Sequence, residues 1–438
     1  MFGYYFDLAL RSLKRNRGLT ALMIVAIAFG VGASMTTLTV LHVLSGDPMP
    51  GKSDKLFYIQ LDPRRANSFR PGEEPADQMT RFDSEALLRA ARGDKQAMMV
   101  GGRAAIEPDR GGVGRFLPFD VDSRWTSADF FPMFDVPFVA GGPWSAVEDQ
   151  RATRVVVITS ALAEKVFGST EVVGRPMRVE GVEMRVVGVV GEFRPVPHFY
   201  DLNTDDFGLG DQLFVPFSVA TELKLHISGS MNCWGDGEPI PDQRALDAPC
   251  DWIQFWVESD TAAKARAYAD FLVSYSEDQA KVGRYQRPPN VRMRDVREYL
   301  DFKKVVPNDV KLQTWIALGF LLVCLVNTVG LLLTKFLRRS GEIGVRRALG
   351  ASRREIFVQL LVESGMIGLV GGALGLGLAW LGLFAVRHQP TSYADLAHLD
   401  VPMLAITFLL AIVSSLFAGM LPAWRGCQVS PAIQLKSH

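Results

Sequence analysis

The sequence lacks the residue patterns that mark common catalytic and metal sites. It has no G-x-S-x-G motif, no H-E-x-x-H motif and no nucleophile with an evident base beside it. Neither His198 nor His226 has a neighbour at zinc-binding spacing. We therefore expect a chain that is not an enzyme and that holds no metal ion or cofactor of its own.

Net charge is also missing, since 47 basic and 47 acidic side chains give a formal charge of zero. We expect no nucleic-acid partner. The charges are unevenly spread: residues 1–18, 335–355 and 422–438 together hold 13 basic and 3 acidic side chains, whereas residues 45–311 hold 33 basic and 41 acidic. Because Lys and Arg in short loops stay on the cytoplasmic side of a membrane, this asymmetry predicts both termini inside and the middle region outside.

Cysteine is scarce, with four in 438 residues. Cys233 and Cys250 flank a loop containing Pro and Gly in the region predicted to lie outside the cytoplasm. An oxidising compartment favours a disulfide between two such residues, and two free thiols are the alternative. Cys324 lies in an apolar run and Cys427 in the basic tail.

Long apolar runs, in contrast, are plentiful, and 48% of the residues are hydrophobic. Four runs reach the ~20 residues that a helix needs to cross the hydrocarbon core of a membrane. The first has no small-residue cleavage site behind it, so we expect it to be retained. The predicted membrane part comprises an interfacial helix at 1–18, spans at 19–44, 311–337, 356–386 and 401–421, an outer loop at 387–400 and a tail at 422–438.

Two spans carry side chains that are costly in lipid. Asn327 in the second span should face another helix, and Glu363 in the third should either reach the cytoplasmic interface or pair inside the helix bundle. The third span also contains overlapping G-x-x-x-G spacings, which let a neighbouring backbone approach closely. From this small-residue face we predict helix packing and a dimer with a second membrane chain, at Gly368, Gly371, Gly372 and Gly375.

The residues between the first two spans, 45–310, predict a mixed α/β domain outside the cytoplasm. Apolar alternation around the Glu180-Gly181 step is typical of a β-hairpin. Thr153 to Thr159 is expected to be a buried strand, followed by a short helix with Ser160 as its N-cap. Further strands are expected at 55–61 and 252–258, helices at 84–92 and 261–274, a glycine-rich connection at 101–114 and a charged, helix-forming stretch at 291–311.

Two motifs in this domain resemble ligand sites without meeting their requirements. Gly46 to Ser53 fits G-x-x-x-x-G-K-[ST], but a membrane helix precedes it, a strand follows it, and two prolines remove amide donors. Asp201 to Asp206 begins like a calcium loop, yet Asp206 stands where such a loop needs glycine. We expect no nucleotide at the first motif and a solvated acidic loop, rather than calcium, at the second.

The stretch from Phe336 to Phe357 carries six arginines between apolar residues at nearly helical spacing. This pattern suits a short amphipathic helix along a membrane surface, in contact with lipid headgroups or a partner. From charge alone, an ordinary positive-inside loop is the simpler interpretation. The residue order, however, reads Glu-Ile-Gly-Val-Arg-Arg-Ala-Leu-Gly-Ala and then Arg-Arg-Glu-Ile, and it resembles the signature of the MacB/FtsX-like ABC permease family.

The resemblance extends over nearly the whole chain and implies a four-span permease whose periplasmic core has a porter-like part with an inserted subdomain. It implies that residues 338–355 form a coupling helix that docks on a separate cytoplasmic ATPase, which would bind the ATP. It also implies a multi-pass protein of the bacterial inner membrane, paired with a second permease copy or a sister permease and in contact with lipids, with a periplasmic adaptor protein as a further candidate partner. The coupling residues that it implies are Glu342, Ile343, Arg346, Arg347, Leu349 and Arg353.

Three functions remain open at this point. The first is the permease of an efflux-type ABC system, in which ATP hydrolysis inside moves the domain outside (mechanotransmission). The second is an FtsX-like regulator of a periplasmic cell-wall hydrolase, and the third is a membrane-anchored binding or sensor module without an ATPase. The size of the 45–310 region fits MacB-like members better than the division regulators.

Overall fold

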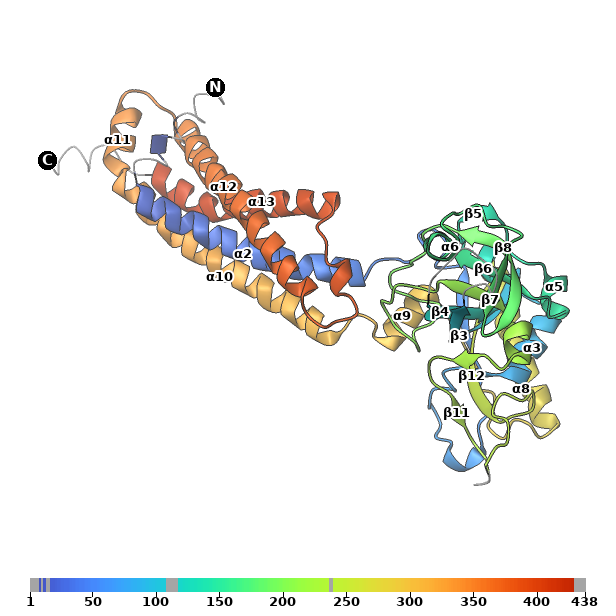
Figure 1. Ribbon diagram of the computed structural model, residues 1–438. Helices are drawn as coiled ribbons and strands as arrows, with labels where there is room; N and C mark the ends of the chain where they lie inside the picture. Colours follow the sequence, from blue (N-terminus) through green and yellow to red (C-terminus); the bar gives the residue numbers. More distant parts are fainter. Residues whose placement is uncertain (1–7, 9–10, 13–15, 108–116, 236–238, 429–438) are drawn as a thin grey trace. The chain divides into compact units, whose positions relative to one another are not determined.

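The computed structural model describes residues 8, 11–12, 16–107, 117–235 and 239–428 (Figure 1). The chain divides into two compact units, one formed by Met1–Ser45 with Val306–His438 and the other by Gly46–Val305. We call the first the helix bundle and the second the sheet domain. The predicted interfacial helix and residues 429–438 of the tail lie largely or wholly outside the described residues.

Four helices among the described residues are long and apolar enough to cross a membrane. Ser352 and Asp400 begin the third and fourth, because each side chain accepts a hydrogen bond from the backbone amide three residues on. The fourth helix is longer than predicted and continues through Pro422. The helices of the bundle are α2 (Arg17–Leu44), α10 (Asn308–Arg338), α11 (Ser340–Ala348), α12 (Arg353–Arg387), the 3-10 helix η2 (Ala394–Leu396) and α13 (Val401–Cys427).

The glycines of α12 pack helices within this one chain. Gly368 and Gly372 face α13 so closely that an added Cβ atom on Gly372 would lie 2.7 Å from a side chain of α13. Gly371 and Gly375 face α2, where a Cβ atom on Gly371 would lie 2.9 Å from Ile27. The two overlapping G-x-x-x-G spacings therefore let two helices of the same chain, α13 and α2, pack closely against α12. The expectation that this face binds a second chain is wrong, because α2 and α13 already fill it.

The sheet domain contains all thirteen strands of the described residues in one mixed sheet. Its strands are β1 (Leu56–Gln60), β2 (Met79–Thr80), β3 (Lys95–Glu107), β4 (Phe119–Thr126), β5 (Phe138–Gly141), β6 (Val155–Thr159), β7 (Pro176–Val179), β8 (Val182–Val190), β9 (Leu213–Pro216), β10 (His226–Ile227), β11 (Asn232–Cys233), β12 (Cys250–Glu258) and β13 (Arg292–Asp295). Its helices are η1 (Ala66–Ser68), α3 (Arg81–Ala90), α4 (Phe130–Met133), α5 (Ala146–Gln150), α6 (Ser160–Phe167), α7 (Phe217–Glu222), α8 (Ala262–Lys281) and α9 (Val296–Lys303).

The strand order is β13-β1-β12-β3-β4-β9-β6-β8-β5, with β4–β9 and β6–β8 parallel and the other neighbours antiparallel. Strands β7 and β8 form the predicted hairpin, with positive φ at Glu180 and Gly181. Three predictions were wrong. Residues 101–107 belong to β3 rather than to a connection, residues 292–295 form the edge strand β13 rather than a helix, and Thr159, not Ser160, caps α6.

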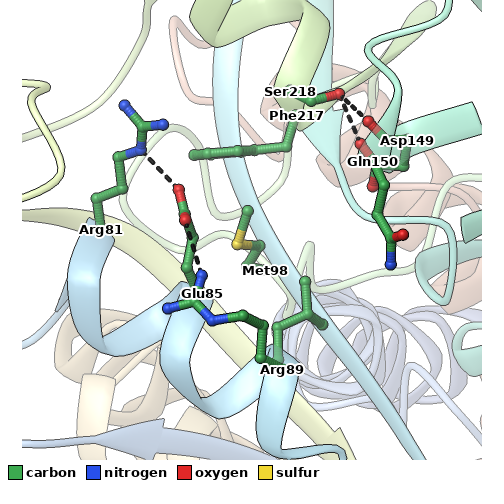
Figure 2. A pocket seen from close by; sticks show the side chains of 9 residues that line it. Arg81, Glu85, Arg89, Met98, Asp149, Gln150, Phe217 and Ser218 are labelled. Atoms are coloured by element: carbon green, nitrogen blue, oxygen red, sulfur yellow. Dashed lines mark hydrogen bonds and ion pairs between the residues drawn. The ribbon is translucent and has the colours of Figure 1, made fainter. Parts of the chain in front are cut away.

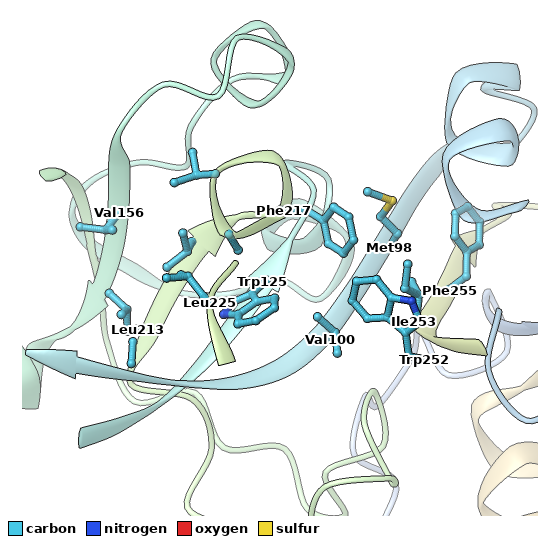
Figure 3. Close-up of a cluster of buried hydrophobic side chains, with 14 of the residues drawn as sticks. Met98, Val100, Trp125, Val156, Leu213, Phe217, Leu225, Trp252, Ile253 and Phe255 are labelled. Carbon is cyan, nitrogen blue, oxygen red and sulfur yellow. The ribbon is translucent and has the colours of Figure 1, made fainter. Parts of the chain in front are cut away.

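Alternate side chains of β3 face two hydrophobic cores on opposite sides of the sheet. Met98 and Val100 point into the first core, which helices α3, α6, α7 and α8 cover, whereas Met99 points into the second. Figure 3 shows the first core, where the rings of Trp125 and Phe217 lie near β3. The second core contains α4 and α9 and is rich in aromatic rings. Each face of the sheet is therefore sealed by its own layer of side chains.

The acidic loop is solvated only in part: Asp205 is exposed and Asp206 is half-buried, but Asp201 at its start is buried, contrary to the prediction. Asp201 is 1% exposed and accepts a hydrogen bond from Arg124 Nη1 at 2.5 Å. Burial by itself raises the pKa of the Asp201 carboxyl, but the guanidinium of Arg124 outweighs burial and holds that pKa below its ordinary value. Within the described residues, no group of three His, Cys, Asp or Glu side chains is placed to hold a metal ion.

The motif at Gly46 to Ser53 folds as a series of turns that leads into β1. Lys52 Nζ lies 2.9 Å from Asp135 Oδ1 and 3.5 Å from Glu258 Oε2. Between the motif and β1, all of it described, there is no helix N-terminus to supply the amides of a phosphate cradle. Lys52 therefore forms ion pairs within the sheet domain.

A disulfide joins Cys233 of β11 to Cys250 at the start of β12, across 17 residues of sequence. Replacing both cysteines with alanine should lower the free energy of unfolding of the sheet domain by about 3 kcal/mol, because the unfolded chain regains the freedom of this loop. Urea unfolding of residues 46–305 measures the change. Reductant should lower the free energy of unfolding of the parent domain by the same amount as the double substitution does, and it should leave the double variant unaffected. Equal stability of parent and variant would contradict the prediction.

Candidate functional site

The coupling segment, residues 338–355, forms a helix–turn–helix between two spans. Helix α11 ends at Ala348, and Gly350 then adopts φ +103°, a left-handed conformation that favours glycine. Ser352 and Glu355 form a capping box that begins α12. The order Leu-Gly-Ala-Ser after α11 therefore ends one helix and starts the next within four residues.

The two apolar residues expected to enter a partner's groove differ in exposure. Leu349 is 83% exposed, and Val345 on α11 is 54% exposed. Ile343 is only 7% exposed and packs into the core of the helix bundle. Its expected contact with an ATPase is therefore corrected: Ile343 anchors α11 to its own chain, and Leu349 with Val345 forms the free apolar surface.

The charged residues of the segment are partly engaged within the chain. Glu342 accepts a hydrogen bond from Arg346 at 3.0 Å, and Arg346 also donates to Gln359 of α12 at 3.1 Å. Arg347 donates to the last carbonyl of α13 at 3.4 Å. Arg353 is exposed in the first turn of α12. A partner would thus meet Arg346 and Arg347 in fixed positions rather than as free side chains.

Glu363 of α12 pairs inside the helix bundle rather than reaching the interface. Its carboxylate lies 2.7 Å from Lys335 and 3.1 Å from Arg339. Lys335 belongs to the last turn of α10, and Arg339 joins α10 to α11. The site therefore has a buried charged side as well as an exposed apolar one.

The sheet domain carries a separate open cleft of about 400 Å³ between α3 and the α5–α7 pair, with β3 as its floor (Figure 2). On one wall Glu85 pairs with Arg81 and Arg89 along α3. On the other wall the Ser218 hydroxyl donates to Asp149 at 2.9 Å. Leu88, Met98 and Phe217 supply its apolar lining.

Burial raises the pKa of the Asp149 carboxyl to about 6, against the opposing hydrogen bonds from Ser218. The cleft thus combines apolar surface with both donors and acceptors, which is the composition of a binding surface.

Comparison with known proteins decides the family. Residues 20–267 match the model of the MacB-like periplasmic core domain, and residues 315–431 match that of the FtsX-like permease C-terminal region. The chain belongs to the MacB/FtsX-like permease family. The second match includes the whole coupling segment, and the first runs from the first span through most of the sheet domain. In this permease the sheet domain is therefore the MacB-like core.

Two relatives are exporters by name. "Macrolide export ATP-binding/permease protein MacB" of Rhodospirillum rubrum is 25% identical over 452 residues, covering 100% of this chain and 61% of the relative. "Pyoverdine export ATP-binding/permease protein PvdT" of Pseudomonas savastanoi pv. phaseolicola is 26% identical over 98% of this chain and 59% of the relative. This chain thus spans about three fifths of their length. The solved periplasmic region of MacB from Actinobacillus actinomycetemcomitans matches with a TM-score of 0.37 and 10% identity over 58% of this chain and 95% of that structure.

Sequence reasoning missed the partners of the buried charges. It expected Glu363 either to reach the interface or to pair inside the bundle but named no partner, although Lys335 stands at the predicted end of the preceding span. Two opposite charges near the same predicted membrane boundary were the signal that could have joined them. The cleft of the sheet domain had no such signal, because its walls come from four separate elements.

Proposed function

We propose that this permease couples ATP hydrolysis by a separate cytoplasmic ATPase to movement of its periplasmic core domain. The observation that carries the proposal is the coupling segment, in which α11 is anchored by Ile343 while Leu349 stays 83% exposed between two spans. A large apolar side chain held in water at the end of a fixed helix suits the centre of a small protein interface. In this proposal the chain is the non-catalytic subunit, with both termini in the cytoplasm of a bacterium with an inner membrane.

The names of the two relatives support outward transport, and an efflux-like action is part of the proposal. The cleft of the sheet domain is the surface that we propose for contact with cargo or with a periplasmic adaptor. Affinity purification of the tagged chain in mild detergent tests the ATPase. A co-purifying chain with nucleotide-binding motifs is the expected result. A well-folded permease that is repeatedly isolated without one would contradict the proposal and favour a sensor or regulator.

We further propose that two copies of this permease pair through the α2–α10 face. Asn327 is exposed on α10 within a membrane span, and it has no hydrogen-bond partner among the described residues. An amide in lipid favours a partner on another helix, and asparagine can both donate to and accept from its own copy. The groove beside it, of about 570 Å³, is lined by Leu22, Ala26, Val326, Asn327, Gly330, Leu331 and Thr334.

Replacing Asn327 with leucine should weaken this pairing by about 1 kcal/mol, or about fivefold, because an interhelical hydrogen bond in a membrane is worth roughly that much. The dimer fraction in native mass spectrometry from gentle detergent measures it. Asn327→Gln keeps the amide and should retain most of the dimer. A dimer fraction that is unchanged in Asn327→Leu would place the interface elsewhere.

A further inference from the structure

A set of buried charges lies where α10 ends, α11 begins and α12 passes. Lys335 is 0% and Glu363 1% exposed at the side chain, and their charged atoms are 2.7 Å apart. Arg339 Nη1 lies 3.1 Å from the second carboxylate oxygen of Glu363. Ser12 donates to the carboxylate, and Lys335 donates to Thr20 of α2 at 3.3 Å. We call these five residues the Glu363 cluster.

The Glu363 cluster continues outward to the surface of the coupling segment. Arg339 also pairs with Glu342 at 3.3 Å, and Glu342 pairs with Arg346 at 3.0 Å. Side-chain exposure rises along this path, from 1% at Glu363 through 12% at Arg339 to 31% at Glu342. A continuous series of ion pairs thus connects the last turn of α11 to a carboxylate inside the helix bundle.

From this geometry we infer that Glu363 is a positioning residue, which fixes α11 to the end of α10 and to α12 so that a force on α11 moves both spans together. The inference rests on the proposed coupling function and adds the part of the chain that receives the force. Ile343, Arg346 and Arg347 hold the rest of α11 to the bundle, so without this connection the start of α11 at Arg339 is the part that would shift. An isolated helix of nine residues has little stability of its own, so it depends on its contacts for a fixed position.

The burial of the Glu363 cluster makes it stiff. A displaced Lys335 or Glu363 would leave an unpaired charge in an apolar bundle, which costs far more than the loss of an exposed ion pair. One carboxylate faces two cations, so both must follow Glu363 when α12 moves. Arg339 is the residue that carries this constraint to α11, since it contacts Glu363 and Glu342 through one planar guanidinium.

The test measures the position of α11 directly, in the full-length chain. Spin labels at Val345→Cys on α11 and Leu322→Cys on α10, both exposed, report their distance by double electron–electron resonance. Cys324 and Cys427 are replaced by alanine in this background. We expect a narrow distance distribution in the parent and at least a twofold broader one in Arg339→Gln. That variant keeps the buried Lys335–Glu363 pair, so we expect it to fold.

Glu363→Gln removes the centre of the cluster and should broaden the distribution further. Arg354→Gln, the same substitution as Arg339→Gln on an exposed arginine of α12, is the matched control and should leave it narrow. The double variant Lys335→Met/Glu363→Gln should unfold less readily than Glu363→Gln alone, because it leaves one unpaired cation fewer. A parent-like width in a folded Arg339→Gln protein would overturn the inference.

This readout needs no ATPase, so its failure is distinct from failure of the proposed function. Where an ATPase co-purifies, the Arg339→Gln permease should keep it bound, because Leu349 remains exposed. The stimulation of ATP turnover by this variant should fall to half of the parent's stimulation or less. Parent-like stimulation together with a broadened distance would also overturn the inference, since α11 would then transmit force without being fixed.

Discussion

Leu349→Glu is expected to reduce recovery of the ATPase with the permease by more than tenfold. Truncating or charging a buried interface anchor costs about 2 kcal/mol or more, which corresponds to about a 30-fold loss of affinity. Leu349 is 83% exposed in the chain and follows the last residue of α11, so the substitution should leave the fold of the permease intact. Quantitative co-purification of the ATPase with each variant measures the effect.

Leu117→Glu is a matched control, because Leu117 is 85% exposed and lies in the sheet domain. The proposal puts that domain on the opposite side of the membrane from the ATPase, so this variant should retain the ATPase fully. Full retention by Leu349→Glu as well would leave the coupling segment as an ordinary positive-inside loop. A loss with both variants would point to general damage rather than to a lost contact.

The contrast between Leu349 and Ile343 shows what the sequence could and could not predict about this site. The residue order identified the segment, and its helical spacing predicted α11. Both residues are apolar and six positions apart, and nothing local distinguishes them. Only the packing of α11 against the bundle decides that Ile343 is buried and Leu349 is free.

The same distinction between local pattern and tertiary contact explains which parts of the fold could be predicted from the sequence. The hairpin of β7 and β8 was predictable, because its alternation and its Glu180-Gly181 turn are local features. Strand β3 was not predicted, and Gly101 and Gly102 in it were assigned to a glycine-rich connection. In the structure an added Cβ on Gly102 would lie 2.6 Å from the indole nitrogen of Trp125, so this glycine makes room for a cross-strand ring. A turn signal and a packing glycine look identical in sequence.

Charge was similarly ambiguous at the edge of the sheet and in the acidic loop. Arg292 and Arg294 of β13 suggested a helix, yet both pair with Glu74 while β13 hydrogen-bonds to β1. Asp201 suggested a solvated loop, yet its partner Arg124 lies 77 positions earlier in the chain. The pairing of charges over such distances depends on the topology of the sheet, which local patterns do not contain.

Arg124→Met is expected to lower the free energy of unfolding of the sheet domain by about 3–5 kcal/mol, because it leaves two buried carboxylates without their cation. The Arg124 guanidinium contacts Asp201 at 2.5 Å and Asp211 at 2.9 Å, and its side chain is 1% exposed. Urea unfolding of residues 46–305 measures the loss. Arg103→Met removes a 3.3 Å pair with Asp122 whose side chains are 63% and 64% exposed, and it should cost at most about 1 kcal/mol.

The pH dependence separates a lost charge from a lost side-chain volume. In the parent, Arg124 lowers the pKa of Asp201, so this carboxylate's contribution to stability is present above its ordinary pKa of 3.8 and is lost as the pH falls through the lowered value. Without Arg124, burial acts on Asp201 against only the smaller lowering effects of His198 and the Thr204 hydrogen bond, so the pKa of Asp201 rises. Acidification then protonates this carboxyl and removes the unpaired buried charge from the variant. The stability difference between parent and Arg124→Met should therefore shrink between pH 7 and pH 4. A difference that is constant over this range would mean that packing, and not the unpaired carboxylates, accounts for the loss.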